Sequence, residues 1–290
     1  MNNILLKARA KINVGLDIAD KRADGYHELR TVMQTVGLHD TVFIKKIDRK
    51  AIKLVTNLRW LPTDERNIVY RAVDFLIEKY NIDGGVFIEI TKNIPVAAGL
   101  GGGSSNCAAA LVGMRNLFGL PVTNAELMTL GRQFGADVPY CLMRGTALAE
   151  GIGERLKRLS PHPDAYVLLA KPPVSISTPE LFGRFELTPE TFHPDIDTVI
   201  QGIRDRSLTA IADALGNTLE DVTASICPAV PKLKRIMLEN SALAAQMSGT
   251  GPTVFGYFHS RAGMRAAENA IARQMPEVKD VFLTYIYNPL

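Results

Sequence analysis

Glycine and serine dominate one short stretch of this chain, and that stretch constrains fold and function more than any other. Residues 95–111 read PVAAGLGGGSSNCAAAL. Glycines let backbone N–H groups approach a ligand without a Cβ in the way. The start of a helix adds N–H groups that have no partner within the helix, together with a partial positive charge. A glycine-rich loop that leads into a helix is therefore typical of an anion site.

The residues after this loop have the spacing of a helix. Apolar side chains recur on one face of residues 107–118, and Gly119 suits the position just beyond a helix C-terminus. Ser104 and Ser105 can cap this helix and can also reach a phosphate oxygen. The sequence thus predicts a loop that wraps the phosphates of a nucleotide through its backbone amides.

Two common phosphate loops can be excluded from the letters alone. A P-loop needs GxxxxGK followed by Ser or Thr, and no Gly-Lys dipeptide occurs in the chain. A dinucleotide fingerprint needs GxGxxG, but counting from Gly99 the sixth position is Ser104. The remaining alternative is a close-packed helix start that binds nothing, although three consecutive glycines cost stability unless their backbone is needed.

Composition excludes several classes of protein. The chain has 290 residues and a net charge of only +3, which does not favour a nucleic-acid binder. The first 60 residues are more basic, a feature of solvated strand faces or of a field that attracts an anionic ligand. The chain has three distant cysteines without a CxxC pair and no HExxH motif, which predicts that it has no structural zinc site. It also has no apolar run of about 18 residues and no secretory signal. Together these features predict a cytoplasmic protein.

Along the chain, hydrophobic periodicity predicts an α+β fold in two domains that join near residues 150–165. Thr123 and Glu126 form a capping box, Asp24-Gly25 is a turn signal, and residues 171–197 are rich in turn formers. Residues 4–18 are expected to form a strand or a hairpin. The other expected strands are 41–47, 51–55, 86–91 and 281–287, and the other expected helices are 66–80, 123–135, 198–215, 229–240 and 260–275.

Three motifs resemble those of the GHMP kinases. They are AKINVGL near the N-terminus, the glycine loop itself, and SGTGPTVF near the C-terminus, in the family's order and spacing. The resemblance implies the two-domain GHMP kinase fold with its active site in the interdomain cleft. Residues 1–157 would be a ribosomal-protein-like, nucleotide-binding N-terminal domain, and residues 158–290 a ferredoxin-like C-terminal domain.

Further stretches resemble one branch of the family. They are RADGYHELRTVMQTVGLHD, TDERNIVYRA, GADVPYC, GTALAEGIGE and KPPVSISTPELF. This resemblance implies transfer of the ATP γ-phosphoryl group to the 2-hydroxyl of a small-molecule substrate, a cytidine diphosphate-linked methylerythritol, in non-mevalonate isoprenoid biosynthesis. It implies ATP and Mg²⁺ as cofactors and neither a nucleic acid nor a membrane as partner. The metal ligands and the oligomeric state stay open.

The resemblance also implies the catalytic residues. Asp137 in GADVP would accept the proton of the hydroxyl, but its spacing suits a helix N-cap equally well. Lys11 in AKIN would hold Asp137 ionised and stabilise the nascent alkoxide, whereas the alternative is a solvated strand lysine. Asn13 lies two residues further, on the same face of a strand, and would help to position the substrate.

Binding residues follow from the same resemblance. Tyr26 and His27 would stack on the cytosine and bond to its edge, with Phe182 on its other side or, alternatively, buried as an anchor. Asn67 would lie near the adenine or simply start a helix. Gly249 and Gly251 would close a third-motif loop on the nucleotide or form a plain helix-to-strand turn. The implied ATP-binding loop comprises Pro95, Val96, Ala97, Ala98, Gly99, Leu100, Gly101, Gly102, Gly103, Ser104 and Ser105.

Three competing functions stay open at this point. The chain can be another GHMP small-molecule kinase of the homoserine or mevalonate type. It can be a non-catalytic nucleotide-binding regulator on the same fold, although Lys11 and Asp137 are both present. It can be an RNA-binding module, although the sequence has no aromatic-basic pattern of an RNA platform.

Overall fold

The computed structural model describes residues 1–22 and 25–289, so Asp24 of the predicted turn lies outside the described residues. Contacts divide the chain into two compact units. The first contains residues 1–10, 39–94 and 101–143, and the second contains residues 11–38, 95–100 and 144–290. The strands β1 (Asn3–Lys21) and β2 (His27–Ile47) contribute to both, and the division also crosses the glycine loop.

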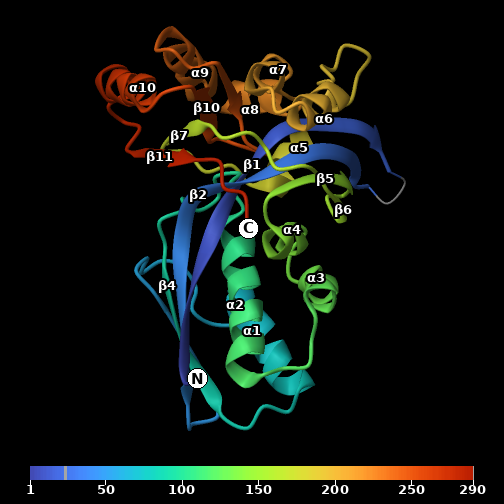
Figure 1. The fold of residues 1–290 in the computed structure, drawn as a ribbon, viewed down its shortest axis with the longest axis vertical. Coiled ribbons are helices and arrows are strands. Elements are labelled where there is room, and N and C mark those ends of the chain that lie inside the picture. The colour runs from blue at the N-terminus through green and yellow to red at the C-terminus, as the bar shows by residue number, and fades with distance from the viewer. Residues whose placement is uncertain (23–24, 290) are drawn as a thin grey trace. The chain divides into compact units, whose positions relative to one another are not determined.

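The first unit combines a small sheet with four helices. The end of β2 pairs antiparallel with β4 (Gly85–Thr91), which pairs parallel with β3 (Ile52–Thr56). Helices α1 and α2 pack against each other, and α4 contacts both α2 and α3 (Figure 1). The helices are α1 (Ile68–Lys79), α2 (Gly102–Phe118), α3 (Asn124–Gly131) and α4 (Val138–Met143).

The second unit contains two groups of paired strands. Residues Leu29–Gln34 of β2 pair antiparallel with β5 (Thr146–Gly151), β5 pairs with β6 (Arg155–Arg158), and β1 pairs parallel with β8 (Gly216–Asn217). A four-stranded antiparallel sheet has the order β11-β7-β10-β9. Its strands are β7 (Tyr166–Lys171), β9 (Ala244–Met247), β10 (Val254–Phe258) and β11 (Asp280–Tyr285).

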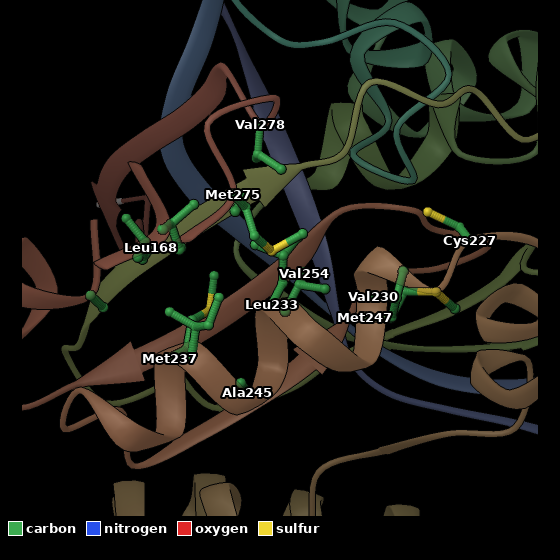
Figure 2. Packing of buried hydrophobic residues seen from close by; sticks show 14 of the residues in the cluster. Leu168, Cys227, Val230, Leu233, Met237, Ala245, Met247, Val254, Met275 and Val278 are labelled. Atoms are coloured by element: carbon green, nitrogen blue, oxygen red, sulfur yellow. The ribbon is translucent and has the colours of Figure 1, made fainter. Parts of the chain in front are cut away.

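The second unit also contains helices, and the last two along the chain pack against this sheet. The helices are α5 (Thr178–Arg184), α6 (Ile196–Arg204), α7 (Leu208–Asp213), α8 (Glu220–Ile226), α9 (Ala229–Glu239) and α10 (Arg261–Gln274). Figure 2 shows Leu233 and Met237 of α9 directed towards Leu168 and Val254 of the sheet, in one apolar cluster. Burying this surface is the main force that holds helices on a sheet.

Most predicted elements are confirmed, including the α+β class. Helix α2 ends at Gly119, which adopts the left-handed conformation with φ 64°, and both bonds of the capping box at Thr123 and Glu126 are present. The single helix expected over residues 198–215 is wrong, because α6 and α7 are separate and Ser207 caps the second. The turn-rich segment 171–197 contains the short helix α5. Among the described residues, no helix has the length and apolar character needed to span a bilayer.

His162 is a buried titratable side chain in the second unit, and its hydrogen bonds define its protonation. Its Nδ1 lies 2.7 Å from the carbonyl oxygen of Pro163, which can only accept. Nδ1 therefore carries the proton, and Nε2 accepts from the Tyr257 hydroxyl at 3.2 Å. Burial lowers the pKa of His162 from 6.5 to about 4, so the folded protein holds this ring neutral.

We expect His162 to make folding weaken on acidification. The unfolded chain takes up this proton near pH 6.5 and the folded chain only near pH 4, so the stabilisation is complete above pH 6.5 and is lost as the pH falls towards 4. The loss between pH 7 and pH 5 is about 2 kcal/mol. Urea unfolding of His162→Gln at both pH values should show a smaller pH dependence than the parent. The exposed-site variant His259→Gln should match the parent, and equal slopes for all three proteins would contradict the assignment.

Candidate active site

Lys11 and Asn13 lie next to each other on β1 in the second unit. Lys11 is only 5% exposed and Asn13 is also buried, so the alternative of a solvated strand lysine is wrong. The Lys11 ammonium donates to Asn13 Oδ1 at 2.6 Å, and Asn13 Nδ2 donates to Thr31 Oγ1 at 2.9 Å. Their catalytic and substrate-binding roles stay predictions, but a buried ammonium held by a neutral oxygen can stabilise negative charge on a ligand.

The third-motif loop lies directly over this pair. It connects β9 to β10, so the alternative of a helix-to-strand turn is wrong. Gly249 has φ 60°, and a Cβ added there would lie 3.0 Å from Asn13 Oδ1 and 3.3 Å from Lys11 Nζ. Gly251 also has a positive φ, of 73°. Glycine is needed at position 249 because its backbone closes on the two polar side chains.

Ser248 joins all three sequence motifs. Its hydroxyl donates to the Gly99 carbonyl oxygen at 3.0 Å and accepts from the Asn13 backbone N–H at 3.2 Å. A Cβ added to Gly99 would lie 2.1 Å from the Ser248 carbonyl oxygen. The N-terminal strand, the first half of the glycine loop and the third-motif loop therefore pack together within the second unit.

Sequence reasoning missed the residue that holds the third-motif loop in place. Asn217 of β8 is buried, and its Nδ2 donates to the carbonyl oxygens of Met247 and Gly249 at 3.0 and 2.8 Å. Its Oδ1 accepts from the Leu219 N–H at 3.0 Å. No local signal marks this asparagine as a support for the loop, because the two carbonyl oxygens that it holds lie about 30 residues further along the chain. Ser248 could have been predicted as a site residue, since it belongs to the third motif.

Left-handed residues recur along the backbone of the glycine loop. Ala97, Gly99 and Gly101 have φ of 51°, 73° and 66°, so left-handed residues alternate with ordinary ones. Such alternation is the backbone pattern of an anion-binding nest. Phosphate binding by this loop stays a prediction.

The expectation that serines cap α2 is wrong. The N-cap is Gly101, which has no side chain, and Ser104 and Ser105 lie inside the first helical turn. The Ser105 hydroxyl donates to the Arg9 carbonyl oxygen at 2.7 Å, so it anchors the helix to β1 within the first unit. The first turn of α2 is therefore left without a side-chain cap at its N-cap position.

A buried polar network supports the start of the glycine loop in the first unit. Lys92 forms an ion pair with Asp40, and both side chains are nearly inaccessible to solvent. Asn106 of α2 bonds to both partners, at 3.0 and 2.8 Å. The other Asp40 oxygen accepts from the N–H groups of Asn93 and Ile94, each at 2.7 Å. This network fixes the two residues that precede Pro95 relative to α2.

Asp137 lies directly before α4, and its carbonyl oxygen accepts from the Cys141 N–H at 3.0 Å. Its side chain is half-buried. The preceding loop lies beside the first turn of α2, since a Cβ added to Gly135 would be 3.6 Å from Ser104 Oγ. This position fits the helix N-cap alternative, and the residue two positions earlier lies beside the start of α2 within the first unit. Its role as a base stays a prediction.

Asn67 starts a helix, as one of its two interpretations predicted. It is the N-cap of α1, where its Oδ1 accepts from the Val69 N–H at 2.9 Å and its Nδ2 donates to the Pro62 carbonyl at 2.8 Å. Gly103, also in the first unit, lies close by, because a Cβ added to it would be 3.7 Å from Ile68 of α1. The contact of Asn67 with adenine stays a prediction.

Aromatic rings gather at the start of β2 in the second unit. His27 stacks on Phe182 with ring centroids 5.3 Å apart and meets the edge of Phe185 at 5.6 Å. These rings are in direct contact with each other in this structure. Their contact with cytosine stays a prediction. Tyr26 is 60% exposed and offers another face. Burial and the nearby charge of Lys21 lower the pKa of His27, which keeps its ring neutral at pH 7.

Phe182 fits the interpretation of a buried anchor, and its contact with cytosine stays a prediction. It is partly buried against the apolar cluster of the second unit, and it still contacts His27. Among the described residues, no three His, Cys, Asp or Glu side chains converge as a metal site would require. The aromatic group and the glycine loop therefore stay candidates for ligand binding.

Comparison with known proteins gives a consistent result. The family described as GHMP kinases N terminal domain matches residues 67–145, and GHMP kinases C terminal matches residues 199–277. These ranges lie on either side of the predicted boundary at 157, which stays a prediction. A 4-diphosphocytidyl-2-C-methyl-D-erythritol kinase of Lachnospira eligens is 48% identical over 289 residues and is covered, like this chain, to 100%.

Two solved structures are similar over nearly the whole chain. A 4-(cytidine 5'-diphospho)-2C-methyl-D-erythritol kinase has a TM-score of 0.84 and 29% identity, covering 99% of this chain and 100% of its own. A homoserine kinase from Cytophaga hutchinsonii has a TM-score of 0.80 and 18% identity, covering 99% and 95%. At that identity the second similarity concerns the fold alone.

Proposed function

Because this chain belongs to the GHMP kinase family, we propose that it transfers the γ-phosphoryl group of ATP to the 2-hydroxyl of 4-(cytidine 5'-diphospho)-2-C-methyl-D-erythritol, a step of non-mevalonate isoprenoid biosynthesis. The observation that carries this proposal is the 48% identity to a kinase of that name along the entire chain. The homoserine kinase shares the fold at only 18% identity. The three thiols are free and buried, which suits a reducing cytoplasm.

The glycine loop is the part of the chain that fits the phosphates of ATP. Its left-handed residues at 97, 99 and 101 and the first turn of α2 supply backbone N–H donors. A Cβ added to Gly102 would lie 3.0 Å from Ile94, so glycine there lets the start of α2 pack closely on the residue before the loop. When bound, Mg²⁺ neutralises charge on the β- and γ-phosphates. We assign it no protein ligand.

The chemistry needs little covalent work from the protein. Phosphoryl transfer depends on alignment of the two reactants and on stabilisation of charge in the transition state. We assign Asp137 as the group that accepts the proton of the attacking hydroxyl. We assign the Lys11 ammonium to the negative charge that develops around the transferred group. Asn13 and Gly249 lie against Lys11 and define the space around it.

Phosphorus NMR tests this function. The protein is mixed with ATP, Mg²⁺ and, in separate samples, the cytidyl substrate, homoserine or mevalonate. We expect a new phosphomonoester signal with the cytidyl substrate alone. Turnover with homoserine or mevalonate instead would support kinase activity but would contradict the proposed substrate. Silence with all three while ATP still binds would favour a nucleotide-binding regulator, and an RNA shift that depends on salt but not on ATP would favour an RNA-binding module.

The aromatic group is proposed to hold the cytosine, and Phe182→Leu tests it. Leucine keeps the apolar packing against the cluster but removes the ring face. Stacking of one base is worth about 1–3 kcal/mol, so KM for the cytidyl substrate should rise about tenfold or more while KM for ATP stays within twofold. Phe192 is 56% exposed in the same unit, and Phe192→Leu should leave both constants unchanged. Equal effects of the two variants would exclude Phe182 from the pocket.

A further inference from the structure

A chain of buried hydrogen bonds reaches the Lys11 ammonium. The Thr31 hydroxyl of β2 donates to the Gly15 carbonyl oxygen at 2.6 Å. The same hydroxyl oxygen accepts from Asn13 Nδ2 at 2.9 Å, and Asn13 Oδ1 accepts from Lys11 Nζ at 2.6 Å. All four residues belong to the second unit, and Thr31 is 1% exposed.

Elementary donor and acceptor rules fix the direction of this chain. A carbonyl oxygen only accepts, so the Thr31 hydroxyl must donate its one proton to the Gly15 carbonyl oxygen. Towards Asn13 the hydroxyl can then only accept, which requires the NH₂ side of the amide. The Oδ1 side must therefore face Lys11, whose ammonium only donates. A flipped Asn13 would set NH₂ against an ammonium and would leave Thr31 facing an acceptor.

The backbone around this chain is already held. The Asn13 N–H donates to Ser248 Oγ at 3.2 Å, and the Lys11 N–H donates to the Leu100 carbonyl at 3.0 Å. These backbone bonds do not fix the rotation of the Asn13 amide or the position of the end of the Lys11 side chain. The Thr31 hydroxyl on the neighbouring strand restricts the rotation of the Asn13 amide. Asn13 in turn restricts the Lys11 ammonium.

We propose that Thr31 is a positioning residue that sets the Asn13 amide and, through it, the Lys11 ammonium. The proposal rests on the function assigned to Lys11 above. It also gives Asn13 a second role, since its oxygen faces Lys11. A small misplacement of a catalytic group can reduce turnover up to a hundredfold, so Thr31 affects the rate without contact with the reacting atoms.

The test compares Thr31→Val with Thr31→Ser. Valine keeps the shape and removes the hydroxyl, whereas serine keeps both hydrogen bonds. We expect Thr31→Val to lower kcat about tenfold or more with KM for ATP within threefold, and Thr31→Ser to restore most of kcat. In an Asn13→Ala background, Thr31→Val should have no further effect, because the residue through which it acts is gone. An undiminished effect in that background would overturn the proposal.

A second readout does not depend on activity. The side-chain amide signal of Asn13 in ¹⁵N-labelled protein, assigned by its loss in Asn13→Ala, should exchange slowly in the parent and faster in Thr31→Val. Unchanged exchange would overturn the proposal. Thr31→Ala replaces the valine variant if that variant melts below the assay temperature. Lys11→Met distinguishes the role of Lys11 from that of Thr31. Full turnover in Lys11→Met would overturn the role assigned to Lys11. A large loss of turnover in Lys11→Met, together with normal turnover in Thr31→Val, would overturn only the role of Thr31.

Discussion

Asp137→Asn is expected to lower turnover by about 10²–10⁴-fold while ATP binding stays nearly intact, because the variant loses the group that accepts the hydroxyl proton. Asparagine has the same shape and cannot act as a base at neutral pH. The donors that the glycine loop offers to the phosphates are backbone N–H groups, so nucleotide affinity should change little. Single-turnover kinetics with the cytidyl substrate measure the chemical step, and calorimetric titration with ATP measures binding.

The same variant separates catalysis from helix capping. Asparagine caps a helix as well as aspartate does, so a capping role for Asp137 predicts nearly normal activity for Asp137→Asn. Asp195 supplies the matched control, because it caps α6 through its bond to the Thr198 N–H at 3.0 Å. Asp195→Asn should keep both stability and turnover. An Asp137→Asn enzyme within threefold of the parent would leave Asp137 as a cap and remove it from the mechanism.

Local signals made several helices predictable. The capping box at Thr123 and the glycine at the end of α2 act within a few residues, so their effect does not depend on the rest of the fold. Periodic apolar residues similarly predicted α1, α9 and α10. The break between α6 and α7 was missed because the apolar spacing continues across Ser207, whose side chain starts the second helix.

The long strand β2 was largely missed because its two faces are both buried. Residues 31–37 are all buried, so no alternation of apolar and polar positions marks them as a strand. The polar residues among them find partners across the fold: Gln34 bonds to the Tyr287 carbonyl and accepts from Thr146 Oγ1. Such distant partners are not readable from a window of neighbouring residues.

The candidate site divides in the same way. Its motifs were recognisable because glycines, a lysine and an aspartate of unusual spacing resemble a known family. The residues that hold those motifs were not, since Thr31 and Asn217 are common residue types whose partners are set by strand pairing and by a loop far along the chain. Sequence therefore suggested candidate ligand-binding groups, but it did not predict the residues that orient them.

The glycine loop yields the second large expected effect. Gly99→Ala should lower the free energy of unfolding by about 3 kcal/mol or more and remove most kinase activity. One part of the cost is the left-handed backbone, since φ is 73° and a Cβ there costs about 1–2 kcal/mol. The larger part is a Cβ placed 2.1 Å from the Ser248 carbonyl oxygen. Relieving that clash must part the loop from Ser248 and break the Ser248 Oγ bond to Gly99.

Gly119→Ala isolates the two costs. Gly119 has φ 64°, and a Cβ added there meets nothing within 4 Å, so this variant carries the left-handed cost alone. Denaturant unfolding of both variants gives the clash as the difference between them, and kcat/KM for ATP tests whether the parted loops still bind the nucleotide. We expect Gly119→Ala to lose about 1–2 kcal/mol and to keep its activity. Equal losses of stability in the two variants would mean that Ser248 moves away from a Cβ at position 99 without a measurable cost. Glycine at position 99 would then be required by its left-handed backbone conformation and not by the packing of the three motifs.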